Sequence, residues 1–123
     1  MAREMKYELS YDKEAHLLLG RVTGEIDPAL VEAMAREVAA LAKQQGCNRL
    51  LNDLREATIP SSASAIYSMP RITDEAGVPP GLRRALVVPA ATRDFLFLET
   101  VALNRGHNTR IFTDPEAARA WLA

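Results

Sequence analysis

The feature of this 123-residue sequence that most constrains its fold is a regular alternation of short apolar runs with amphipathic helical segments. The segments at 58–77, 92–106 and 114–123 have helical spacing, and each follows an apolar run, at 47–54, 83–90 and 109–112 respectively. Strands that alternate with helices in this way are joined by right-handed crossovers and lie parallel in one sheet. The alternation therefore predicts an α/β fold.

The N-terminal segment predicts a pair of strands in front of this pattern. Tyr7, Leu9 and Tyr11 alternate with polar residues, as the inward side chains of a half-buried strand do, and a turn leads to a second apolar run at 16–24. The expected order of elements is ββαβαβαβα. We predict a single domain, 1–123, built on one mixed, mostly parallel, five-stranded sheet.

Two of the helical segments carry clear boundary or breaking signals. Asp27 is placed to cap the first long helix, and Pro28 occupies its first turn, where a missing backbone N–H costs nothing. Gly46 is placed to end that helix in the left-handed conformation. The next helical segment contains Pro70, which removes a backbone donor and predicts a kink or a division into two short helices.

Composition excludes several classes of partner. The 15 Lys and Arg residues balance the 16 Asp and Glu residues, so the net charge does not favour a nucleic acid or an anionic membrane as a partner. No apolar run approaches the length of a membrane span, and the N-terminus lacks the apolar core of a secretory signal. We expect a cytoplasmic protein.

Signatures of catalysis and metal binding are missing from the sequence. It contains no glycine motif of the dinucleotide-binding, P-loop or nucleophile-elbow type. Cys47 and His107 both precede predicted strands, at the edge of the sheet where such folds seldom place their chemistry. We interpret Cys47 as a small buried residue and His107 as a solvated loop residue. We therefore expect no enzymatic activity, no metal site and no cofactor.

The carboxyl ends of the strands predict where a binding site lies. In an open α/β sheet, free amides and the positive ends of helix dipoles converge at this edge. Thr58 or Ser61 is expected to cap the second helix there. We predict a partner- or ligand-binding rim at this edge, made of Asp53, Arg55, Thr58, Ser61, Ser64 and Arg93.

Three segments carry a resemblance to a known family. They are NDLREATIPSSASAI (52–66), FLFLETVALNRG (95–106) and the closing TRIFTDPEAARAWL (109–122), and the short strand ALVVPA (85–90) also matches. Together with the order of elements, they make the chain similar to proteins of the STAS fold, which include anti-sigma-factor antagonists. The chain most resembles the stand-alone bacterial STAS/SEC14-like proteins of the sporulation-antagonist superfamily.

The resemblance implies a regulatory, non-enzymatic protein-interaction module. In the antagonists, a partner kinase phosphorylates a serine at the start of the second helix, and this changes which partner is bound. When DLREATIPSSAS is laid beside the family's DLSGVTFIDSSG, Ser62 falls at the phosphoacceptor position. Ser61 replaces the family's aspartate and Ser64 its glycine. The implied partner is a kinase or an anti-sigma factor; the oligomeric state stays open, with a homodimer as one option.

The SEC14-like side of the resemblance implies a different function, the binding of a lipid or another small apolar ligand under the second helical region. Apolar side chains at helical spacing also describe an ordinary core, so the two interpretations stay open. The residues that would line such an apolar pocket are Ile59, Ile66, Tyr67, Met69 and Ile72.

Overall fold

The computed structural model describes residues 6–123, and its elements follow the predicted order. The strands are β1 (Tyr7–Asp12), β2 (Leu17–Glu25), β3 (Arg49–Thr58), β4 (Arg83–Val87) and β5 (Thr109–Phe112). The helices are α1 (Pro28–Gln45), α2 (Ala63–Glu75), α3 (Arg93–Asn104) and α4 (Pro115–Leu122). β1 pairs antiparallel with β2, and β2 to β5 pair in parallel, in the spatial order β1-β2-β3-β4-β5. The predicted mixed, mostly parallel, five-stranded sheet is confirmed.

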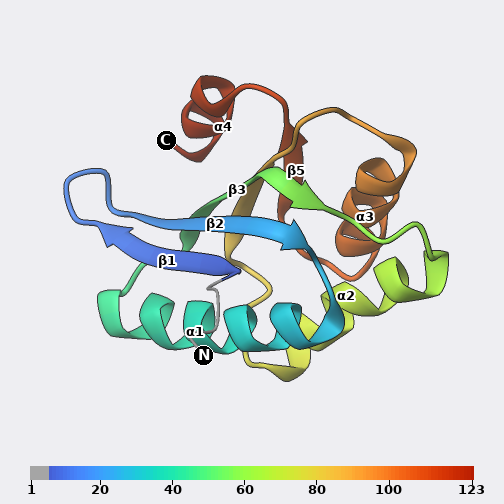
Figure 1. Cartoon of the computed structure of the whole chain (residues 1–123). Coiled ribbons are helices and arrows are strands. Elements are labelled where there is room, and N and C mark those ends of the chain that lie inside the picture. Colours follow the sequence, from blue (N-terminus) through green and yellow to red (C-terminus); the bar gives the residue numbers. More distant parts are fainter. Residues whose placement is uncertain (1–5) are drawn as a thin grey trace, which may run out of the picture.

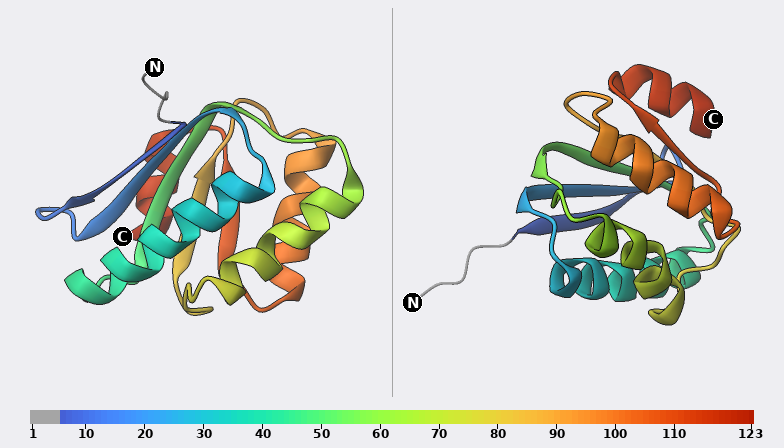
Figure 2. Two further views of the ribbon diagram at one scale, coloured as in Figure 1. Left: turned by 60° about the horizontal axis from the view of Figure 1, so that its bottom comes forward. Right: turned by 90° about the vertical axis from the view of Figure 1, so that its right-hand side faces the viewer.

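The helices divide unequally between the two faces of the sheet. Figures 1 and 2 show α1, α2 and α3 on one face and α4 on the other. Side chains alternate along each strand, so Leu50 and Leu54 of β3 belong to the core under α1–α3, whereas Leu51 belongs to the core under α4. Among the described residues, α4 is the only helix that covers this second face, where it contacts β3, β4 and β5.

The helix caps explain why α1 begins and ends where it does. Asp27 Oδ1 accepts a hydrogen bond from the backbone N–H of Leu30 at 2.8 Å, and Gly46 ends the helix at a φ of 59°. Both features were predicted from the sequence. A helix in this fold needs such caps because its first N–H groups have no partner within the helix.

The prediction was wrong in the middle of the chain, where β3 is longer than expected. The predicted strand ended at 54, but β3 continues to Thr58 along β2. Arg21 pairs with Asp53 while Thr23 pairs with Glu56, so β3 holds one extra residue, a β-bulge. The bulge interrupts the alternation of inward and outward residues, so the strand period in the sequence does not extend past 54.

The second helix also departs from the prediction. α2 begins at Ala63, and its cap is Ser62, whose Oγ accepts from the N–H of Ala65 at 3.3 Å; the prediction that Thr58 or Ser61 caps the helix was wrong. The helix is continuous through the buried Pro70, so of the two predicted alternatives the division into two short helices was wrong, and the kink stays a prediction. No helix among residues 6–123 is long and apolar enough to cross a membrane.

We predict that the α4 side of the sheet depends on Leu122, which is buried with Leu51 and Val87. Leu122→Ala should lower the free energy of unfolding by about 2–5 kcal/mol, because it leaves a cavity in that smaller core. Leu103→Ala, at an exposed position of α3, is the matched control and should change it by less than about 0.5 kcal/mol. Urea denaturation curves measure both, and equal losses would contradict this description of the core.

Candidate functional site

The structure divides the predicted rim into two groups. The first group, Asp53 and Arg55, lies on β3 and lines a shallow hollow on the α4 side of the sheet, with Arg21 and Arg119. The Asp53 carboxylate accepts hydrogen bonds from Arg55 Nε at 3.0 Å and Arg55 Nη2 at 2.9 Å. The bond from the Arg55 side chain holds the pKa of Asp53 below its ordinary value. The charges of these two residues therefore neutralise each other.

The second group lies where α2 and α3 begin, at the same end of the molecule in both views of Figure 2. The Ser62 hydroxyl, besides capping α2, shares a hydrogen bond of 3.0 Å with the Ser64 hydroxyl. The members of this group are all exposed; they are Thr58, Ser61, Ser62, Ser64 and Arg93. The predicted rim is thus not one continuous row.

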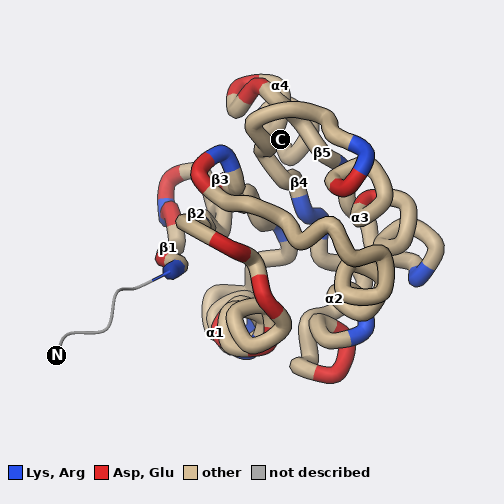
Figure 3. The backbone as a smooth tube through the Cα atoms, turned by 45° about the vertical axis from the view of Figure 1, so that its right-hand side comes forward, with Lys and Arg blue, Asp and Glu red and all other residues tan. Residues whose placement is uncertain are grey.

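The segment around Ser62 carries no charged residue from Ala57 to Pro70. Figure 3 shows this stretch free of acidic and basic residues as it leaves β3 and enters α2. Two large apolar side chains stand out near the helix starts, Tyr67 with 65% of its surface exposed and Leu96 with 44%. An uncharged surface with an exposed tyrosine has the composition of the centre of a protein interface.

A cavity lies under α2, but its walls differ from those of the predicted apolar pocket. A cavity of about 140 Å³ lies between the sheet and the three helices α1, α2 and α3. Of the five predicted residues, only Met69 lines it. Ile66 is completely buried outside the cavity wall, and Ile59 and Ile72 are partly buried. Tyr67 is exposed, because one residue along an α-helix turns the side chain by about 100° away from the buried face.

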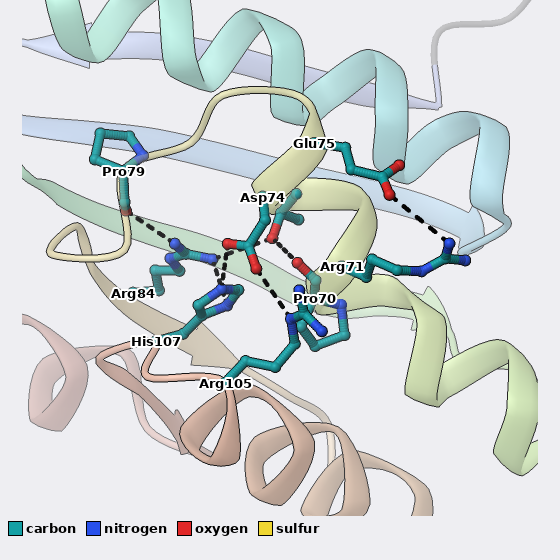
Figure 4. A network of polar contacts seen from close by, with 9 residues as sticks. Pro70, Arg71, Asp74, Glu75, Pro79, Arg84, Arg105 and His107 are labelled. Carbon is teal, nitrogen blue, oxygen red and sulfur yellow. Dashed lines mark hydrogen bonds and ion pairs between the residues drawn. The ribbon is translucent and has the colours of Figure 1, made fainter.

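Sequence analysis missed a partly buried network of ionisable groups at the opposite edge of the sheet (Figure 4). His107 is only 2% exposed, so its interpretation as a solvated loop residue was wrong. His107 Nε2 lies 2.6 Å from Asp74 Oδ1, and His107 Nδ1 lies 3.1 Å from Arg84 Nη1. Arg105 Nε donates to Asp74 Oδ2 at 2.9 Å. Cys47, in contrast, is buried as predicted.

The hydrogen bonds fix the tautomer of His107. A guanidinium can only donate, so Nδ1 accepts from Arg84, and the proton is on Nε2, which donates to Asp74. Burial and then the positive charge of Arg84 lower the pKa of His107, against the opposing effect of Asp74. Burial also lowers the pKa of Arg84 to about 10, which leaves the guanidinium charged at neutral pH. Burial raises the pKa of Asp74, but hydrogen bonds from Arg105 and His107 outweigh it, and the net shift is downward.

One signal in the sequence points to this network. Arg84, Leu86 and Val88 alternate along β4 and its extension, so Arg84 occupies an inward position among buried residues. A charge at such a position requires partners. Their identity cannot be read from spacing, because Asp74 and His107 reach Arg84 only through the tertiary fold. Within residues 6–123, no cluster of three His, Cys, Asp or Glu residues is arranged to hold a metal ion.

No protein-family model matches this chain, and no curated protein is significantly similar to it. Several solved structures are similar. An anti-sigma factor antagonist from Mycobacterium paratuberculosis superposes with a TM-score of 0.61 at 16% identity, over 94% of this chain and 93% of that one. An uncharacterised protein with a SpoIIAA-like fold from Shewanella loihica PV-4 gives 0.63 at 16% identity, over 100% and 99%. The Bacillus cell fate determinant SpoIIAA in its phosphorylated form gives 0.51 at 15% identity, over 94% and 98%.

These similarities confirm the predicted fold. The chain has the STAS-like architecture of the anti-sigma factor antagonists over nearly its whole length, with the same ββαβαβαβα order. At this level of identity the likeness shows the fold and assigns no function to any residue of this chain.

We predict that the network makes the fold sensitive to mild acid. His107 binds a proton less readily in the folded chain than in the unfolded chain, so the free energy of unfolding should fall as the pH drops from about 7 to 5. Asp74, Arg84 and Arg105 surround the imidazole, and the lowered pKa of Asp74 adds a further loss only below about pH 4. Urea denaturation at a series of pH values measures both phases.

The two histidines provide a matched pair for this measurement. His107→Gln should lower stability at pH 7 by about 1–3 kcal/mol, since Arg84 loses an acceptor, and should flatten the pH dependence between 7 and 5. His16→Gln, at an exposed turn between β1 and β2, should keep that dependence. The description of the network is wrong if the His16 variant loses this pH dependence of stability and the His107 variant keeps it.

Proposed function

We propose that this chain is a non-enzymatic protein-interaction module that is switched by the charge at Ser62. It binds a kinase or an anti-sigma factor through a surface that we call the helix-start surface. This surface consists of the exposed residues at the beginnings of α2 and α3, namely Thr58, Ser61, Ser62, Ser64, Tyr67, Arg93 and Leu96.

The observation that carries the proposal is the position of Ser62. It is the exposed cap of α2, in the middle of a stretch without charged residues from 57 to 70. A partner can therefore approach the start of α2 without removing a charge from water. The exposed Tyr67, one turn into α2, offers the kind of large, rigid side chain that carries binding energy in protein interfaces.

The surroundings of Ser62 also favour a phosphate there. The N–H groups of the first turn of α2 and the positive end of its dipole stabilise an anion at the cap. The carboxylates of β3 that stand before this segment are already neutralised, Asp53 by Arg55 and Glu56 by Arg21. Two negative charges would thus change the character of the start of α2, which carries no charged residue from 57 to 70.

The similar structures support the same function. One of them is an anti-sigma factor antagonist, and another is SpoIIAA in a phosphorylated form. In this chain, Arg55 is bound to Asp53 on β3, so the helix start itself rather than Arg55 would hold the phosphate.

We predict that Tyr67→Lys abolishes capture of the partner from a lysate of the native host. A charge placed on the helix-start surface would have to be buried in the interface. Leu103→Lys changes another exposed apolar residue, near the far end of α3, and should leave capture unchanged. Affinity capture followed by quantitative mass spectrometry provides the measurement. Equal capture by both variants would contradict the proposed surface.

We predict further that the charge at Ser62 controls this capture. Ser62→Asp should shift the amount of partner bound at least several-fold relative to unphosphorylated wild type, whereas Ser62→Ala should bind as unphosphorylated wild type does. The alanine variant should also lose about 1 kcal/mol of stability, because the cap of α2 is removed. Intact-mass measurement of the protein from its host should show one added phosphate in wild type and none in Ser62→Ala. The switch is refuted if all three proteins capture the same partners equally.

A second candidate function, the binding of a small apolar ligand, is supported by the cavity between the sheet and α1–α3. Its walls are mostly apolar side chains, and its volume of about 140 Å³ is close to that of engineered cavities of roughly 150 Å³ that accept benzene. Native mass spectrometry of protein purified from its host should show a retained small molecule if this is the function. If every preparation shows only the mass of the chain without a ligand, this second function is contradicted.

A further inference from the structure

We infer that the cavity is a binding site for a small apolar carboxylic acid, whose carboxylate is held on the floor of the sheet by Arg84 and Thr109. This inference rests on the second candidate function and specifies the chemistry of its ligand. It assigns a role to a group of buried polar atoms that the fold leaves without partners.

The apolar part of the ligand is specified by the helices. α1 contributes Leu30, Met34 and Val38 to the wall, α2 contributes Met69 and α3 contributes Leu98. These side chains offer no hydrogen bonds apart from the weak acceptor of methionine sulfur. Given the volume, a single ring or a short branched chain fits.

The polar part is specified by the sheet. Three buried side-chain atoms have no hydrogen-bond partner among the residues that the structure describes: Asn52 Oδ1, Arg84 Nε and Thr109 Oγ1. All three residues line the cavity. Arg84 is 7% exposed and Thr109 is 5% exposed, so bulk water does not supply the missing bonds. Unpaired buried groups are rare because each costs about 1–3 kcal/mol, and three around one cavity indicate a missing partner.

The strand register places these groups on one patch. Arg84 of β4 is the direct neighbour of Thr109 on β5 and of Leu50 on β3, and Asn52 stands two residues after Leu50 on the same face. Direct neighbours in a sheet are about 5 Å apart, and diagonal neighbours about 7–8 Å. A planar carboxylate can therefore accept from Arg84 Nε–H and Thr109 O–H together. The Asn52 amide can turn to present its N–H₂ group instead of its oxygen.

The charge of Arg84 favours a carboxylate over a neutral polar group. Its other hydrogen bonds reach only uncharged acceptors: His107 Nδ1 at 3.1 Å, the Pro79 carbonyl at 3.0 Å and Thr73 Oγ1 at 3.4 Å. Within residues 6–123, no carboxylate makes a salt bridge with this guanidinium, and Figure 4 shows Asp74 engaged with His107 and Arg105. A buried cation without a contacting anion is costly, and a ligand carboxylate would supply that anion.

The test compares benzoate with benzene, two probes of one ring that differ by the carboxylate. Titration of the ¹⁵N-labelled full chain, followed by amide chemical shifts, gives the affinity and the location of each probe. Benzoate should shift the amides of β4 and β5 around Arg84 and Thr109, and should bind at least tenfold more tightly than benzene. Thr109→Val keeps the shape of the side chain, removes the unpaired hydroxyl and should weaken benzoate about tenfold while leaving benzene unchanged.

Two alanines of α1 provide a matched pair of filling variants. Ala35 lines the cavity, so Ala35→Leu should abolish the binding of both probes. Ala33 is exposed on the same helix, and Ala33→Leu should leave both affinities unchanged. Thr113→Val, at an exposed threonine after β5, serves as the control for Thr109→Val.

The outcomes separate this inference from the function on which it rests. If benzene binds as tightly as benzoate and Thr109→Val alters neither, the cavity still takes apolar ligands, but the carboxylate inference is overturned. If neither probe shifts the amides that surround the cavity, both the carboxylate inference and the apolar-ligand function are overturned. Enclosed water molecules then make the hydrogen bonds of the unpaired atoms. Benzoate binding that survives Ala35→Leu would lie outside the cavity and would also overturn the inference.

Discussion

The buried guanidinium of Arg84 is the group on which the three-helix side of the structure depends. It stands at an inward position of β4, and the fold surrounds it with groups from several elements. Asp74 comes from the last turn of α2, Arg105 from the end of α3 and His107 from the entry to β5. The network therefore joins the ends of both helices to the sheet. Removing one partner leaves a polar group of the network without its hydrogen bond, which costs about 1–3 kcal/mol.

The helix α2 takes part in both proposed functions. Its first turn, with the Ser62 cap, forms part of the helix-start surface, and its middle, through Met69, forms part of the cavity wall. Its last turn carries Asp74, which holds the charged network together. Surface, cavity and network thus lie along one short helix that packs against α1 and α3. This arrangement explains why the same region of sequence suggested a switch and a ligand pocket at once.

Local signals in the sequence predicted the architecture well. The strand and helix periods, and caps such as Asp27 and Gly46, act within a few residues, so the order of elements and the sheet could be inferred. The extension of β3 was missed because its bulge interrupts the strand period and leaves two consecutive charged residues, Arg55 and Glu56, both exposed. The role of His107 was missed for another reason. Its partners stand 33 and 23 residues away in the chain, and only the packing of α2 and β4 brings them together.

The protonation state of His107 tests the central claim most directly, because it reports whether Arg84 is charged and bonded inside the fold. Long-range ¹H–¹⁵N NMR of the imidazole distinguishes the two neutral tautomers and the protonated ring. At pH 7 the account predicts a single neutral form of His107, with the proton on Nε2 and an unprotonated, hydrogen-bonded Nδ1. A ring that exchanges between tautomers, or that is protonated at that pH, would contradict it.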